Sequence, residues 1–317
     1  MIAIDWADWG LRAPDRVLPV SGGLINRSFC AEWSDGDRLF VQQVNAQVFT
    51  DLEAIECNLQ LVLGHPISAF TVAPILRRDG RVHGLDGWRV FPFVSEADSP
   101  VDPGLLGRFW GEFTATLNAR PAAWRSVLPH FHSAALRWEQ WSAVRDRIPS
   151  TYRGLAKALE DAASTFLALE RNLPAAVQHH DAKRSNVIAS AAGLRAIDLD
   201  TLQMGYLGSD FGDLVRSTAA LRAEDEPEEN GCNPEAFEAV WEGYASAYAP
   251  ARELAARVRQ MPAYLTWLQA LRFATDAASG NTYYAVTYGE QNWHRAQNQR
   301  SLLESLLREF PFESRST

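Results

Sequence analysis

The feature of this sequence that most constrains its fold is a single change of hydrophobic period, near residue 94. Before that point, short apolar runs are separated by glycine-containing turns, as in antiparallel strands. After it, apolar residues recur at helical spacing in long segments. The sequence therefore predicts an α+β chain of two lobes: a small β-rich lobe with one helix over residues 1–94, and a larger, mainly helical lobe over 95–317.

In the N-terminal lobe, three antiparallel strands are expected between Leu18 and Asn45, followed by a helix capped by Thr50 or Asp51. Two further short strands are expected over residues 71–80 and 85–94. The polar, proline-bearing segment that follows is typical of a connection between lobes.

In the C-terminal lobe, helices are expected over 104–119, 135–148 and 151–173, with three more near the C-terminus. The helical pattern is interrupted between residues 177 and 200. This stretch indicates a loop, a short strand, a turn at Gly193 and a second short strand.

Composition excludes several classes of protein. No stretch approaches the ~20 apolar residues of a membrane span, and the opening residues do not resemble a signal peptide, so we expect a cytoplasmic protein with no membrane partner. A net charge of -9 disfavours binding to nucleic acid. Three widely spaced cysteines, Cys30, Cys57 and Cys232, are expected to be buried thiols rather than disulfides or zinc ligands.

The interrupted segment contains the residues with the clearest chemistry. HHDAKRSN places Asp181, Lys183 and Asn186 in the order and spacing of a kinase catalytic loop, and IDLD follows after a hairpin-length gap. Phosphoryl transfer needs a group that orients the attacking hydroxyl, and oxygen ligands for magnesium. We therefore expect Asp181 to orient the hydroxyl, Lys183 to neutralise the phosphoryl group, and Asn186 and Asp198 to hold Mg²⁺.

The neighbours of these residues have less definite roles. His179 is expected to support the loop by hydrogen bonding, and His180 to be incidental. Asp200 should share a face with Asp198 and is an alternative metal ligand, although the apolar residues before Asp198 favour the latter. The alternative that HHDAKRSN is only a polar loop, and IDLD only a strand end, is weakened by their occurring together.

Asp210, Phe211 and Gly212 spell the metal-binding triplet of protein kinases, but they lie too far beyond the catalytic loop. We expect this segment to enter a helix. Asp210 or Asp213 would then cap backbone amides or brace the catalytic loop.

The nucleotide side is less well defined, because the chain has only two lysines, Lys157 and Lys183, and none lies in the first lobe. The third strand offers glutamine where a kinase carries its nucleotide-anchoring lysine. Arg27 or Arg38 is a possible substitute. Glu53 or Glu56 would be the usual partner of that lysine, unless both simply face solvent. The candidate nucleotide contacts are Gly22, Gly23, Asn26, Gln42 and Gln43.

Four blocks of sequence resemble the phosphotransferase enzyme family that includes aminoglycoside and choline kinases, and most of all its N-acetylhexosamine 1-kinases. They are GGLINRSF, LFVQQVN, the catalytic blocks HHDAKRSN and AIDLDTLQMGYLGSDFGDLVR, and the C-terminal LRFATDAASGNTYYAV with NWHRAQNQ. The resemblance implies a two-lobed protein-kinase-like fold. Leu24 and Gln43 depart from it, because a polar residue and an arginine are expected there.

The same resemblance implies the site and its cofactors. Asp181 would be the catalytic base, Asn186 and Asp198 the magnesium ligands, and Arg272 and Tyr284 contacts to a sugar. ATP would be the co-substrate, with Mg²⁺ as cofactor.

Three functions follow from this reading. The first is a kinase for a sugar hydroxyl, at the anomeric position of an N-acetylhexosamine or related hexose. The second is a kinase for an aminoglycoside or choline-like amino alcohol, for which the acidic run at 225–230 would supply an acidic pocket unless it is only a solvated loop. The third, motivated by the missing lysine, is a catalytically silent protein that binds a metabolite.

Overall fold

The computed structural model describes residues 4–20, 25–84, 86–97 and 100–312. They form two compact units. The first combines the described residues of 1–99 with 120–129 and 186–203, and the second combines 100–119 and 130–185 with the described residues from 204 onward. The first stretch of the first unit ends close to residue 94, where the hydrophobic period changes.

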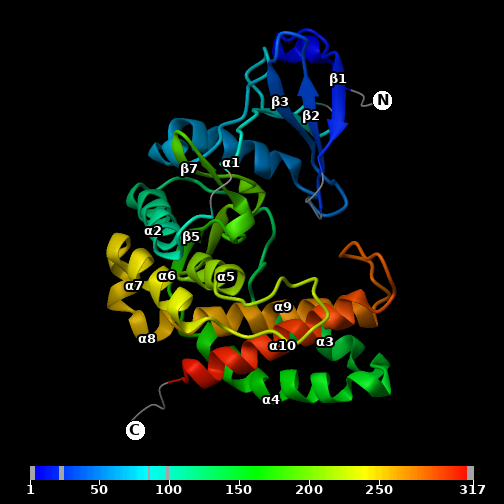
Figure 1. Ribbon diagram of the computed structural model, residues 1–317, viewed down its shortest axis with the longest axis vertical. Helices are drawn as coiled ribbons and strands as arrows, with labels where there is room; N and C mark the ends of the chain where they lie inside the picture. The colour runs from blue at the N-terminus through cyan, green and yellow to red at the C-terminus, as the bar shows by residue number, and fades with distance from the viewer. Residues whose placement is uncertain (1–3, 21–24, 85, 98–99, 313–317) are drawn as a thin grey trace. The chain divides into compact units, whose positions relative to one another are not determined.

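The first unit contains a four-stranded antiparallel sheet in the order β1-β2-β3-β4 (Figure 1). Its strands are β1 (Arg16–Pro19), β2 (Arg27–Glu32), β3 (Arg38–Gln43) and β4 (Trp88–Pro92). β2 and β3 are joined by the predicted Asp-Gly turn, in which Gly36 has a φ of 94° that only glycine adopts without strain. The predicted antiparallel meander is confirmed.

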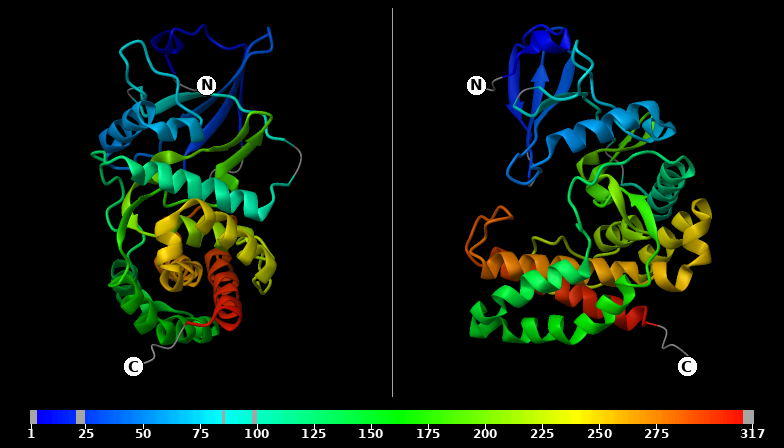
Figure 2. Two further views of the ribbon diagram at one scale, coloured as in Figure 1. Left: turned by 90° about the vertical axis from the view of Figure 1, so that its left-hand side faces the viewer. Right: turned by 180° about the vertical axis from the view of Figure 1, so that it is seen from behind.

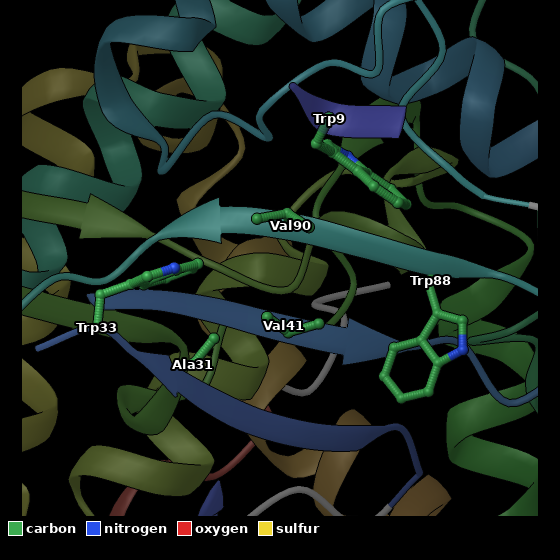
Figure 3. Close-up of a cluster of buried hydrophobic side chains, with 6 residues drawn as sticks. All are labelled: Trp9, Ala31, Trp33, Val41, Trp88 and Val90. Atoms are coloured by element: carbon green, nitrogen blue, oxygen red, sulfur yellow. The ribbon is translucent and has the colours of Figure 1, made fainter. Parts of the chain in front are cut away.

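One face of this sheet carries the core of the first unit. Figure 3 shows Ala31 and Val41 between the indoles of Trp33 and Trp88, with Val90 on the neighbouring strand. All of these side chains are almost completely buried. Alternation along the strands places them on one face, so the sheet is stabilised by apolar burial against the N-terminal 3₁₀ turn η1 (Trp6–Trp9).

Helix α1 (Leu52–Gly64) follows the third strand and begins where the sequence indicates. The Asp51 carboxylate accepts a hydrogen bond of 2.9 Å from the N–H of Ala54, which caps the helix. A 3₁₀ turn, η2 (Pro66–Phe70), continues the chain. The strand predicted over 71–80 is wrong. Thr71 and Ile75 each form only an isolated bridge, and Pro74 between them has no N–H to extend a ladder.

The predicted hairpin after the catalytic loop is confirmed as β6 (Val187–Ser190) and β7 (Gly193–Ala196). It belongs to the first unit because several bonds tie it there. The N–H of Val72 donates to the Ala196 carbonyl at 3.2 Å, and the Asn58 amide donates to the Leu202 carbonyl at 2.8 Å.

The second unit is mainly helical, as predicted. Its long helices are α2 (Pro103–Ala119), α3 (Ala134–Val144), α4 (Arg153–Glu170), α5 (Ser209–Thr218), α6 (Pro234–Ala247), α9 (Met261–Ala278) and α10 (Gln291–Glu309). Two short helices, α7 (Ala249–Glu253) and α8 (Ala255–Val258), lie between α6 and α9. β5 (Ala175–Gln178) and β8 (Gln203–Tyr206) pair as a small ladder that the sequence did not indicate, because four residues give little periodic signal.

Helix α2 packs closely against α6, and α10 packs against α9 (Figure 2). Glycine makes the first of these approaches possible. A Cβ at Gly107 would lie 2.2 Å from the Val240 carbonyl oxygen, and one at Gly243 would lie 2.1 Å from the Gly104 carbonyl oxygen. Among the described residues, no helix is both long and apolar enough to cross a membrane. The α+β class predicted from the change of period is confirmed.

Candidate active site

The catalytic loop of the second unit follows β5 and brings the two expected catalytic side chains together. The Lys183 ammonium donates to an Asp181 carboxylate oxygen at 2.9 Å, and both side chains remain partly exposed. The N–H of Asp181 donates to Nδ1 of His179 at 3.3 Å, so His179 supports the loop as predicted. The ion pair fixes the position of the Asp181 carboxylate in the loop.

Asp210 braces this loop. Its two carboxylate oxygens accept hydrogen bonds of 2.9 Å from the N–H groups of His179 and His180, and its own N–H donates to the Gln178 side chain. Complete burial is the main reason that the pKa of Asp210 rises to about 7, and these hydrogen bonds act in the opposite direction. The prediction that the Asp-Phe-Gly segment has a bracing role is confirmed.

The two histidines are integral to the loop. The His179 ring packs edge-on against Trp110, with ring centroids 5.0 Å apart. His180 has a left-handed backbone, with φ of 66°, and its Nδ1 lies 3.0 Å from the Gln178 carbonyl oxygen. A Cβ at Gly205 would lie 1.9 Å from its ring, so glycine is required opposite it. The expectation that His180 is incidental is therefore wrong.

Asp213 lies on α5 beside the same loop. It forms an ion pair of 2.8 Å with Arg216, which also pairs with Glu224 at 2.9 Å. Burial, followed by the charge of Asp181, raises the pKa of Asp213, and Arg216 opposes this effect. The loop is also tied to α5 by a 3.0 Å bond from the Arg184 N–H to the Ser217 hydroxyl.

The two expected magnesium ligands lie at one end of the β6–β7 hairpin in the first unit. Asn186 precedes β6, Asp198 follows β7, and the Ile197 N–H donates to the Asn186 carbonyl at 3.0 Å. Asp198 adopts a left-handed conformation, with φ of 60°, which is unusual outside glycine and is concentrated at functional sites. An amide oxygen and a carboxylate fit Mg²⁺, which takes few protein ligands and completes its shell with phosphates and water. Within the described ranges, no group of three or more His, Cys, Asp or Glu side chains is arranged to hold a metal ion.

Asp200 has a different environment from Asp198. It is 1% exposed, and its carboxylate forms a buried ion pair with the Arg89 guanidinium and accepts a 2.9 Å bond from the Asn26 amide. Burial alone would raise the pKa of Asp200, but Arg89 and Asn26 hold it below its usual value. The Asp200 carboxylate is thus engaged by Arg89 and Asn26 within the first unit.

The expected nucleotide contacts lie in the first unit, where most bond to one another. Gln42 accepts a 3.1 Å bond from Nε of Arg89, and Gln43 donates to the Asp86 carbonyl at 3.1 Å. Asn26 bonds both Asp200 and the N–H of Asn45. Gly22, Gly23 and Leu24 lie outside the described residues.

Arg89 is the residue that sequence reasoning missed. It lies on β4 directly opposite Gln42, is 1% exposed, and is the buried cation next to the position where a lysine was expected. A lone arginine within the apolar run WRVFPFV was its signal, since a buried arginine must be paired. The proposed substitutes are engaged elsewhere: Arg27 bonds Gln43, and Arg38 bonds Ser95.

The two helix glutamates also differ from each other. Glu53 forms an exposed ion pair with Arg81. Glu56 is buried, and it accepts bonds from the N–H of Val82 and from the N–H and ring of His83. Burial would raise the pKa of Glu56, but these bonds lower it to about 2. The alternative that Glu56 simply faces solvent is therefore wrong, because Glu56 braces the segment before β4.

The two expected sugar contacts lie together in the second unit. The Arg272 guanidinium on α9 is 5.5 Å from the ring centroid of Tyr284, and the ring of Phe131 is nearer, at 4.8 Å. The Tyr284 hydroxyl lies 3.4 Å from the amide of Gln269, which also bonds Arg272. Burial raises the pKa of Tyr284 to about 12, so the phenol stays neutral.

Several solved structures are similar to this chain in fold. The chain is similar in fold to the amicoumacin kinase hAmiN, solved with AMP-PNP, Ca²⁺ and Ami, with a TM-score of 0.61 and 12% identity over 94% of this chain and 90% of that one. It is also similar to choline kinase from Cryptosporidium parvum, with a TM-score of 0.63 and 12% identity over 93% and 88% of the two chains. For the spectinomycin phosphotransferase APH(9)-Ia the TM-score is 0.62 and the identity 11%, over 95% and 94%.

These identities establish likeness of fold alone. The family assignment comes from the sequence profile of the phosphotransferase enzyme family, which matches residues 16–254. This match covers most of the chain and includes Asp181, Lys183, Asn186 and Asp198. The chain therefore belongs to the phosphotransferase enzyme family.

Proposed function

We propose that this protein is a magnesium-dependent kinase that transfers the γ-phosphoryl group of ATP to a hydroxyl group of a sugar. The observation that carries the proposal is the pairing of Asp181 with Lys183 in a loop whose backbone is held by the buried Asp210 carboxylate. A carboxylate fixed in this way, ionised and partly exposed, is suited to accept the proton of an attacking hydroxyl.

Each residue then has a defined part in the reaction. Asp181 orients the acceptor hydroxyl and takes its proton, and Lys183 stabilises negative charge on the transferred group. Asn186 and Asp198 would hold magnesium, which when bound neutralises the phosphate oxygens. Asp200 holds the Arg89 guanidinium in place by an ion pair, and Gln42 orients the same guanidinium.

The acidic run between 225 and 230 bears on which acceptor is used. Asp225 forms an ion pair with Arg295, and Arg222 pairs with Glu226 at 3.2 Å and with Glu228 at 3.9 Å. Carboxylates already neutralised by arginine make a poor pocket for an ammonium group. This favours a sugar over an amino alcohol or aminoglycoside.

The proposal of a catalytically silent protein rested on the missing lysine. Arg89 supplies a buried cation beside Gln42, and the catalytic loop is complete, so both observations favour an active enzyme.

The test is a screen for ATP-dependent phosphorylation of hexoses, N-acetylhexosamines and amino alcohols, run with and without Mg²⁺, with thermal-shift titration of the nucleotide in parallel. We expect magnesium-dependent turnover of a sugar, and loss of the magnesium-dependent nucleotide shift in Asp198→Ala. A nucleotide shift without turnover of any acceptor would support the silent alternative. If the nucleotide shift stays fully magnesium-dependent in Asp198→Ala but loses this dependence in Asp200→Ala, then Asp200 rather than Asp198 is the magnesium ligand.

A further inference from the structure

The second unit contains two arginine side chains, next to a buried histidine, that the proposed reaction does not yet explain. Arg272 on α9 and Arg137 on α3 approach the same aromatic ring, with guanidinium carbons 4.8 and 5.9 Å from the ring centroid of Phe131. The guanidinium of Arg272 also faces Tyr283 at 5.6 Å. His132, stacked on Phe131, completes the group, which we call the Arg272 cluster.

The two arginines of the Arg272 cluster bond mainly to neutral groups. Among the residues that the structure describes, no carboxylate lies within 4.0 Å of the guanidinium of Arg272 or Arg137. Their hydrogen bonds go to neutral groups: Arg272 to the Gln269 side chain at 3.1 Å, and Arg137 to the Gln140 side chain and the Phe131 carbonyl. Nε of Arg137 and Nδ1 of His132 are buried without a partner.

Electrostatics within the cluster agree with this geometry. Burial and then the charge of Arg272 lower the pKa of Arg137 to about 10. Burial, His180 and the two arginines hold the pKa of His132 well below its usual value. Two positive charges and two buried nitrogen atoms without a partner, Nε of Arg137 and Nδ1 of His132, therefore lie at one place, and a bound anion would stabilise them.

The cluster is also close to the catalytic loop. Burial lowers the pKa of the Arg272 guanidinium, but two neighbouring tyrosines and Asp181 act in the opposite direction, and the net pKa lies above its usual value. The ring of His132 also lies edge-on to the ring of His180 in the catalytic loop, with ring centroids 5.1 Å apart.

We propose that the acceptor carries a carboxylate in addition to the hydroxyl that is phosphorylated, and that Arg272, together with Arg137, binds this carboxylate. This inference rests on the proposed function and narrows the acceptor to an acidic sugar. A guanidinium presents a planar pair of donors that matches a carboxylate, and the exposed Tyr283 offers a ring face on which a sugar packs. A cationic acceptor would meet repulsion at the same place.

The test uses the full-length protein and acceptors that differ only in charge on one ring: glucose, glucuronate and glucosamine, with galactose and galacturonate as a second pair. Calorimetry with Mg²⁺ and a non-hydrolysable ATP analogue measures binding, and a coupled assay measures kcat and KM. We expect an acidic sugar to bind roughly 10-fold or more tightly than its neutral partner, and glucosamine to bind most weakly.

Substitution at Arg272 tests whether this side chain causes the preference for an acidic sugar. Arg272→Gln should raise the Kd and KM for the acidic sugar roughly 10- to 100-fold, and by a larger factor than for the neutral sugar. Arg272→Lys keeps the positive charge but loses the planar pair of N–H donors. Its Kd and KM for the acidic sugar should therefore lie between those of the wild type and those of Arg272→Gln. Arg252→Gln, an exposed arginine on α7, is the matched control and should behave like the wild type.

The proposal is overturned if no acidic sugar binds in preference to its neutral partner, or if Arg272→Gln lowers affinity for both equally. Binding of the acidic sugar that depends on Arg272, without turnover of any acceptor, would instead reject the proposed kinase activity and retain the carboxylate site. The two failures are therefore distinguishable.

Discussion

The buried arginine of the first unit and the arginine cluster of the second solve the same physical problem differently. Arg89 is 1% exposed and is neutralised within the chain by Asp200, with Gln42 as a further acceptor. Arg272 and Arg137 face aromatic rings and neutral amides instead. The second unit can neutralise arginine, as Arg216 with Asp213 and Glu224 shows, so the lack of a carboxylate at Arg272 is local. A charge balanced inside the chain contributes to the fold, whereas one left for a ligand contributes to recognition.

The largest effect on stability is expected from Asp200→Ala, which leaves Arg89 buried without its counter-charge. We expect the free energy of unfolding to fall by about 3–5 kcal/mol. Denaturant titration of the full chain measures it. Arg272→Gln is the matched comparison and should cost little or even stabilise, because it relieves repulsion with Arg137. Equal losses in the two variants would remove the distinction between the two arginine environments.

The next effect is a difference between the two units in how their stability depends on pH. The pKa of Glu56 is lowered from 4.5 to about 2, so its contribution to stability is present above pH 4.5 and fades as the pH falls toward 2. The pKa of Asp210 is raised from 3.8 to about 7, so its contribution is present below pH 3.8 and is lost as the pH rises through 7. The slopes of stability against pH therefore have opposite signs.

Melting temperatures of the wild type, Glu56→Gln and Asp210→Asn between pH 3 and 8 measure this contrast. Relative to the wild type, Glu56→Gln should lose most stability near neutral pH and less in acid. Asp210→Asn should abolish the part of the wild-type decline that occurs between pH 4 and 7. Parallel curves for all three proteins would show that neither carboxyl titrates as described.

The smallest effect is expected from Gln42→Ala, which removes one acceptor from Arg89 but leaves Asp200 in place. Hydrogen bonds to a charged group are worth about 1.5–3 kcal/mol, and unfolding should become easier by an amount within or below this range. Gln43→Ala, whose partners are Arg27 and the Asp86 carbonyl, is the control and should change stability by less. A larger loss for Gln43→Ala would mean that Gln42 does not support Arg89.

The sequence predicted those parts of the molecule that depend on local pattern. The change of period predicted the α+β class, and the Asp-Gly turn predicted the β2–β3 hairpin. The bracing role of Asp210 was also inferred correctly, because its position before a helix limits what a carboxylate can do there.

What the sequence did not reveal depends on contacts between distant residues or on backbone geometry. Arg89 and Asp200 are 111 residues apart, and no spacing rule links them. The left-handed backbone at His180 and Asp198 has no signature in the side chains. The strand expected over 71–80 has suitable residues but forms only single bridges, because pairing is decided by the neighbouring strand as well as by propensity.

The role of Asp181 as the proton acceptor is tested by the turnover of Asp181→Asn. The assay uses the acceptor that the wild type prefers, with saturating ATP and Mg²⁺, and nucleotide binding is measured on the same variant. Asparagine keeps the shape of the side chain but cannot accept the hydroxyl proton. We expect the kcat of Asp181→Asn to fall by roughly 10²- to 10⁴-fold, while its nucleotide affinity and melting temperature are retained. Turnover at the wild-type rate would contradict this role of Asp181.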